Sequence, residues 1–128
     1  MPKKEIPPEV RRFILTSIPS VPHIEALILM RATAPARWTP LDLAQRLYVP
    51  PAVVHGVLTD LCGSGMLQCD DSTSTYYFNE QPNELCAVIA RLALLYSTNL
   101  VEITLLIHSK LDRKAQQFAD AFNFRKET

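Results

Sequence analysis

The sequence of residues 38–67 is WTPLDLAQRLYVPPAVVHGVLTDLCGSGML, and it contains two helix start signals followed by one stop signal. Thr39 precedes Pro40, and Asp42 follows three positions after the threonine, which predicts a helix capped by the threonine hydroxyl. The pair Pro50-Pro51 opens a second predicted helix, and Gly65 supplies the left-handed residue with which helices commonly end. The stretch therefore predicts two short helices joined by a tight turn.

Apolar residues at helical spacing give each of these two helices an inner face. In the second helix, Val54, Leu58 and Leu61 fall at positions i, i+4 and i+7. The inner residues of the first helix, which ends near Tyr48, are Leu43, Ala44 and Leu47. We also expect Leu41 to pack near the cap of the first helix. Two helices with facing apolar stripes predict a pair that packs against a common core.

Two further helices are predicted before this stretch. Residues 8–18 place apolar side chains at helical spacing, and Pro19 ends the pattern. Ser20 can then cap a helix over residues 21–32, with Pro22 in the first turn, where its missing N–H costs nothing. Trp38 follows as a short strand or plug.

After the stretch, the pattern changes from helix to hairpin and back. Residues 66–69 and 75–79 are predicted strands around the polar turn DDSTS. A helix starts at Pro82-Asn83, and Ser97-Thr98-Asn99 either breaks it or lets a second helix begin. An apolar stripe with spacings of three and four residues then continues from Leu100 to Phe122. The predicted class is mainly α with a small β-hairpin.

Composition describes an ordinary single globular domain and excludes several functional classes. The 128 residues are 48% hydrophobic, and 13 basic residues balance 13 acidic ones, so no overall charge attracts nucleic acid or anionic membrane. Only three glycines argue against a glycine-rich phosphate loop. We expect one compact domain, divided into an N-terminal arm and first helix (1–19), a core (20–81) and a C-terminal helical dimerisation or docking region (82–128).

The three cysteines and the apolar C-terminal half carry no metal or membrane signal. Cys62, Cys69 and Cys86 are expected to be reduced thiols in small core positions, because a zinc site would need a fourth ligand such as His55. Residues 85–107 are apolar, but Arg91 and Glu102 interrupt them, so we expect buried core here and no membrane partner. The N-terminus has no signal-peptide core, and the expected location is cytoplasmic.

The predicted order of elements resembles the winged helix-turn-helix domain of bacterial transcriptional regulators such as the MarR-like families. The family pattern is matched at Thr39, Leu41, Leu43, Leu47, Val49, Val54, Leu58, Leu61, Gly65, Met66 and Leu67. Ala44 lies where a small residue lets the two helices cross closely, whereas Pro50-Pro51 makes the turn stiffer than the pattern requires. The resemblance implies a winged helix-turn-helix with long C-terminal helices. A plain helix pair followed by a hairpin is the alternative.

In such a domain the second helix of the pair enters the major groove of DNA. The resemblance then implies a nucleic-acid-binding surface that consists of Pro51, Ala52, His55, Gly56, Thr59 and Arg46. Arg46 is the only arginine or lysine between residues 38 and 82. Five acidic residues, among them Asp60 and the wing pair Asp70-Asp71, give that segment a net charge of −4. Double-stranded DNA is the expected partner. The cations of the N-terminal arm and the last helix either lie on solvated faces and tails or bring charge to the groove. A winged helix adapted to bind another protein is the alternative.

The last predicted helix is apolar on more than one stripe, which indicates a surface beyond the core of its own domain. The expected interface residues are Leu100, Ile103, Ile107, Leu111, Phe118 and Phe122. We expect a homodimer through this helix, and a docking surface for a different protein is the alternative. No nucleophile elbow, HExxH motif or convincing acid pair is present, so the sequence predicts a non-catalytic protein without cofactor or metal.

Overall fold

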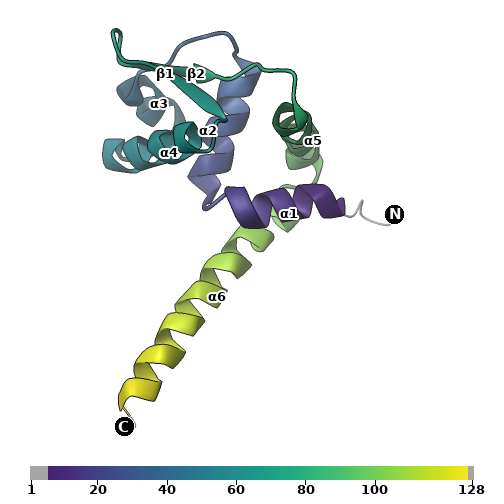
Figure 1. Ribbon diagram of the computed structural model, residues 1–128, viewed down its shortest axis with the longest axis vertical. Helices are drawn as coiled ribbons and strands as arrows, with labels where there is room; N and C mark the ends of the chain where they lie inside the picture. The colour runs from purple at the N-terminus through teal and green to yellow at the C-terminus, as the bar shows by residue number, and fades with distance from the viewer. Residues whose placement is uncertain (1–5, 127–128) are drawn as a thin grey trace.

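The computed structural model describes residues 6–126, except for the side chains of residues 110–115 and 122–126. The elements, in chain order, are α1 (Pro8–Ser17), α2 (Val21–Ala32), α3 (Pro40–Leu47), α4 (Pro51–Gly63), β1 (Leu67–Asp70), β2 (Thr75–Phe78), α5 (Glu84–Thr98) and α6 (Leu100–Lys126). Helices α2, α3 and α4 gather beside the hairpin, α1 and α5 lie next to them, and α6 projects away (Figure 1).

Helices α2, α3 and α4 pack on one another around a shared apolar core. The buried side chains that they contribute include Ile24, Leu27, Met30, Leu43, Ala44, Val54, Leu58 and Leu61. The inner faces predicted from helical spacing are therefore confirmed, with Leu47 partly buried at the edge of the core. The expectation for Leu41 is wrong. Its side chain is 57% exposed, because it follows the capping turn on the outer side of α3.

The helix caps explain where the elements begin and end. The Thr39 hydroxyl accepts a hydrogen bond from the Asp42 N–H at 3.1 Å, as predicted, and Gly65 has the left-handed φ of 79°. Ser20 occupies the N-cap position of α2 but does not cap it through its side chain. Its hydroxyl is instead 2.5 Å from Nδ1 of His23. A nearby imidazole competes with the backbone for a serine hydroxyl, so sequence rules for caps missed this contact.

The hairpin forms the wing and is extended by Trp38. Strands β1 and β2 are antiparallel, with Leu67 opposite Phe78 and Asp70 opposite Thr75. Trp38 and Tyr76 exchange two backbone hydrogen bonds of 2.8 Å, so the predicted short strand or plug at the tryptophan is a single-residue β-bridge. The arrangement is a winged helix-turn-helix with long C-terminal helices, as the sequence predicts.

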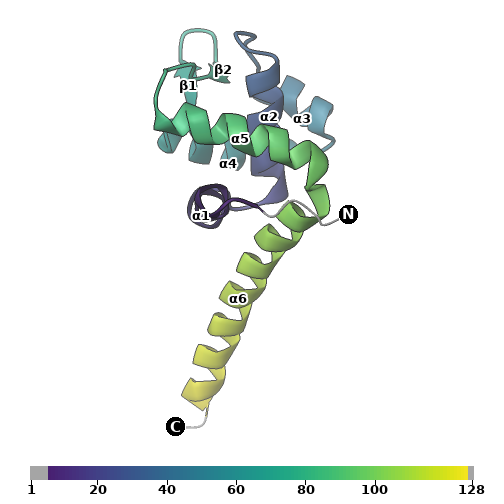
Figure 2. The ribbon, with the colours of Figure 1, turned by 90° about the vertical axis from the view of Figure 1, so that its right-hand side faces the viewer.

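Helices α5 and α6 are separated by a sharp break. The Asn83 side chain caps α5 by accepting from the Cys86 N–H at 2.9 Å, and Asn99 ends the helix. The chain then bends by 111° into α6. The start of α6 packs against α1 and α5, where Ile103 and Ile107 are buried, and the rest of the helix projects alone in both views (Figures 1 and 2).

The cysteines occupy different environments. Cys62 and Cys86 are partly buried, and burial, reinforced by the nearby Cys69, raises the pKa of Cys62 to about 11. Cys69 is exposed on β1, so the expectation that all three thiols fill core positions is wrong for this residue. Strand alternation places Cys69 on the same face of β1 as the buried Leu67, but Cys69 lies two residues nearer the hairpin turn. Among the described helices, no single one is long and apolar enough to cross a membrane.

Candidate nucleic-acid interface

Helix α4 has one buried face and one open face. Val54, Val57, Leu58 and Leu61 anchor the buried face in the core. The five α4 residues of the predicted nucleic-acid-binding surface are exposed: Pro51, Ala52, His55, Gly56 and Thr59. Val53 joins them with 42% of its surface exposed. Val53 was not predicted there, although the spacing of Val54, Leu58 and Leu61 leaves it outside the buried face.

The open face of α4 has few side chains that can donate or accept hydrogen bonds. The Thr59 hydroxyl donates to the backbone carbonyl of His55 at 2.9 Å, so its bonding capacity is partly used within the helix. A Cβ atom added at Gly56 would meet no described atom within 4 Å apart from its chain neighbours and the backbone of its own helix. The surface around His55 is therefore made mainly of methyl and methylene groups. We name Ala52, Val53, His55, Gly56 and Thr59 the α4 stripe.

Asp60, which would repel phosphates, is held by a histidine from α2. Its Oδ2 is 2.8 Å from Nε2 of His23, whose other nitrogen contacts the Ser20 hydroxyl. His23 is buried, whereas 57% of the Asp60 side chain is exposed. This chain of contacts ties α4 to the start of α2. Sequence spacing could not reveal it, because the two residues lie 37 positions apart.

The acidic wing is also compensated by a partner that precedes it in the sequence. Asp70 accepts from Ser72 through its N–H at 3.1 Å and its hydroxyl at 2.6 Å, and it pairs with Arg37 at 2.6 Å. These bonds, first from Ser72 and then from Arg37, hold the pKa of Asp70 below its ordinary value. The Arg37 guanidinium also lies 4.6 Å from the centre of the Tyr77 ring. Asp70 is thus part of the turn architecture.

Arg46, the one cation expected at the interface, lies at a different groove. It is exposed on α3 and lines a groove of about 390 Å³ between α2, α3 and the end of α5. Glu25, Leu29 and Tyr96 line the same groove, where burial and then Glu25 raise the pKa of Tyr96. The structure therefore does not bring Arg46 together with the α4 stripe.

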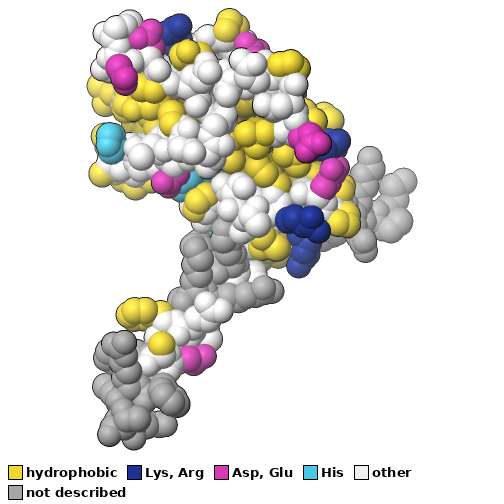
Figure 3. Space-filling view, in the orientation of Figure 1, with side chains coloured by type: hydrophobic (Ala, Val, Ile, Leu, Met, Phe, Trp, Pro, Cys, Tyr) yellow, Lys and Arg dark blue, Asp and Glu magenta, His cyan; other side chains and the backbone are white. Residues whose placement is uncertain are grey.

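Charge is distributed unevenly over the described surface. In Figure 3, hydrophobic side chains gather over α3 and α4 on the left, with a histidine among them. The dark-blue arginines seen in this view lie near the hairpin and over α1 and α5, away from α4. Any contact of α4 with phosphates would depend on backbone groups or on cations from elsewhere.

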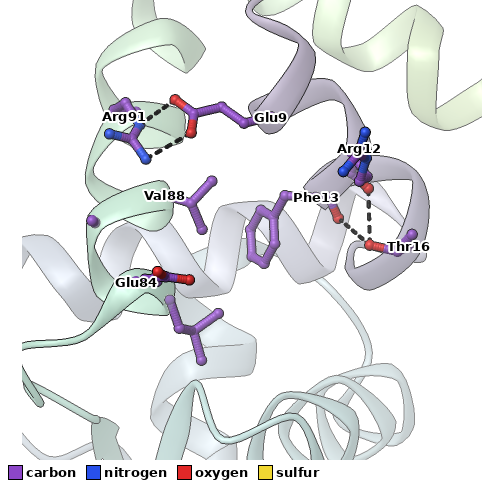
Figure 4. Close-up of a pocket in the computed structure, with 9 residues that line it drawn as sticks. Glu9, Arg12, Phe13, Thr16, Glu84, Val88 and Arg91 are labelled. Atoms are coloured by element: carbon purple, nitrogen blue, oxygen red, sulfur yellow. Dashed lines mark hydrogen bonds and ion pairs between the residues drawn. The ribbon is translucent and has the colours of Figure 1, made fainter.

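A groove of about 610 Å³ lies between α1 and α5 (Figure 4). Phe13 and Val88 contribute apolar surface, and Glu9 forms a double contact with Arg91 of 2.8 and 3.0 Å. This ion pair joins α1 to α5 across the groove. Sequence spacing could not reveal this pair, because its partners lie 82 positions apart.

The predicted interface residues of α6 divide into two sets. Leu100 and Phe118 are exposed, Phe118 by 75%, whereas Ile103 and Ile107 are fully buried in their own chain. The side chains of Leu111 and Phe122 lie outside the described residues. Val101 and Leu105, each 61% exposed, lie on the open side of the helix and were not in the predicted set. The two isoleucines hold α6 in place from the inside.

Neither a family model nor a curated protein matches this chain. The crystal structure of the adhesin competence repressor (AdcR) from Streptococcus pyogenes is similar to it with a TM-score of 0.48. The two chains are 20% identical, and the match covers 94% of each.

Proposed function

We propose that this protein is a transcriptional regulator that binds duplex DNA with the outer face of α4 in the major groove. The observation that carries the proposal is the α4 stripe itself, an open helix face held out by a winged-helix core and used by no described part of the chain. Helix α4 follows α3 through a three-residue connection and precedes the hairpin, which is the order in which such domains present their recognition helix. This function would place the protein in the cytoplasm.

The arrangement of acids supports DNA binding over the protein-interaction alternative. Asp60 and Asp70 gave the segment much of its negative charge, and His23 and Arg37 hold their carboxylates at 2.8 and 2.6 Å. A carboxylate with an internal cationic or hydrogen-bonding partner repels an approaching phosphate less than a free one. Because cations are scarce near α4, we expect binding to be of modest strength and to rely less on phosphates than is usual.

We further propose that the protein binds DNA as a homodimer formed through α6. The helix has 27 residues and extends about 40 Å, and its open side carries the exposed apolar side chains of Val101, Leu105 and Phe118. Apolar surface of this kind on a projecting helix is typical of an interface. A second copy would add a second α4 to the complex.

Fluorescence anisotropy with a duplex selected from a random 20-base-pair library tests the DNA-binding proposal. We expect saturable binding at 50 mM salt, and a plot of log affinity against log salt with a slope of about −2 to −4, because each neutralised phosphate adds about −0.9. A salt-independent signal, or no selected duplex that binds at low salt, would contradict the proposal. A scrambled duplex of equal composition serves as the control.

A further inference from the structure

We infer that the α4 stripe recognises thymine through the 5-methyl groups that thymine displays in the major groove. The inference rests on the proposed DNA-binding function and names the feature of the DNA that α4 contacts. Bases are commonly distinguished by Arg, Lys, Asn or Gln, whose forked groups match the hydrogen-bonding edges of the bases. The outer face of α4 has none of these residues.

The hydroxyl group on this face is already engaged. Thr59 donates its hydroxyl hydrogen to the carbonyl oxygen of His55 at 2.9 Å. What Thr59 adds to the surface besides that oxygen is its methyl group. His55 is then the one side chain of the α4 stripe with nitrogen atoms to offer to a base. Hydrogen bonding alone would distinguish few sequences here.

The remaining surface is apolar and lies on one side of the helix. Ala52 and Thr59 are seven positions apart, which places them on the same face two turns from each other, and Val53 flanks them with 42% of its surface exposed. Between them, Gly56 leaves room for a close approach, since nothing in the chain occupies the space beside it. Alanine and threonine methyl groups are the usual protein partners of the thymine methyl.

Replacement of thymine by deoxyuridine tests the inference, because uracil keeps every hydrogen-bonding group and lacks only the methyl. The probes are a duplex selected from a random 20-base-pair library and the same duplex with uracil at each thymine of the site. We expect the uracil duplex to bind about fourfold more weakly for each methyl contact that is lost. Uracil placed only in the flanking pairs should change nothing.

Two substitutions of Thr59 connect the effect to α4. Thr59→Ser keeps the hydroxyl bond and removes the methyl, so it should weaken binding to the thymine duplex about fourfold and leave the uracil duplex unaffected. Thr59→Val keeps methyl groups and removes the hydroxyl, so it should preserve the preference for thymine. Equal melting temperatures for the three proteins would show that folding does not cause the difference.

Each other outcome overturns a specific step. Equal affinity of the wild type for both duplexes, or selected sites without thymine, would overturn methyl recognition while the proposed DNA binding stands. The preference for thymine could also persist in both Thr59→Ser and Val53→Ala. This result would mean that DNA shape is sensed elsewhere in the protein, and it would overturn the inference. Absence of binding to either duplex at low salt would overturn the proposed function together with the inference.

Discussion

Gly56→Ala is expected to make the protein more stable and its DNA binding weaker. Glycine in a helix costs about 1 kcal/mol relative to alanine, and the new Cβ would meet nothing within 4 Å, so the free energy of unfolding should rise by about that amount. For a chain of 128 residues this corresponds to a melting temperature about 3–5 °C higher. On the DNA, the same methyl would separate α4 from the bases.

The expected loss of affinity is comparable to that of a mismatched base pair, about 1–3 kcal/mol, or about five- to 150-fold. Gly63→Ala is the matched control, because Gly63 is also in α4 with open space beside it, but at the far end of the helix. It should raise the melting temperature and leave affinity unchanged. Differential scanning fluorimetry and anisotropy measure the two quantities. If Gly56→Ala bound DNA as tightly as the wild type, the expected close approach of α4 to the bases at Gly56 would be wrong.

The double substitution Val101→Glu/Leu105→Glu is expected to convert a dimer into a monomer that has lost its DNA affinity. Both side chains are 61% exposed in the single chain, so the change should leave the fold intact. In a dimer they would face the second copy, where unpaired carboxylates are costly. Light scattering should then give the monomer mass of 14.4 kDa in place of twice that value. Loss of the second α4 should weaken binding by about 10²- to 10⁴-fold.

A variant with the same added charge elsewhere separates the interface from a general charge effect. Gln68→Glu/Gln81→Glu adds two carboxylates at exposed positions outside α6 and should keep the dimer mass. A wild-type mass of 14.4 kDa at micromolar concentration would contradict the homodimer. A dimer that persists in the Val101→Glu/Leu105→Glu variant would show that another surface of the chain forms it.

Local sequence signals predicted the helices of the core well. The Thr39 cap, the start at Pro51 and the left-handed Gly65 depend on a few neighbouring residues, and α2 has the predicted bounds of residues 21–32. Inner faces followed from helical spacing, because the core needs one continuous apolar stripe on each helix. The cap rule failed at Ser20, whose hydroxyl contacts the His23 imidazole and does not cap the backbone of α2.

Contacts between distant residues could not be predicted in the same way. The net charge of residues 38–82 leaves out Arg37, which lies one position before the segment, and His23. Both residues contact acidic side chains of that segment, Arg37 at Asp70 and His23 at Asp60. In α6, helical periodicity placed Ile103 and Ile107 in one predicted interface with Leu100. A helix that packs on one side and is open on the other carries one set of apolar residues for its own core and a second set on its exposed side. Only the packing against α1 and α5 distinguishes them.

Hydrogen–deuterium exchange of the wild-type protein, alone and with a selected 20-base-pair duplex, tests most directly whether α4 is the DNA-binding element. We expect slower exchange in residues 51–59 and in the hairpin over residues 67–78 when DNA is bound. Residues 84–98 of α5 should exchange at the same rate in both samples. Protection confined to α1 and α5, with α4 unchanged, would mean that α4 is not the DNA-binding element.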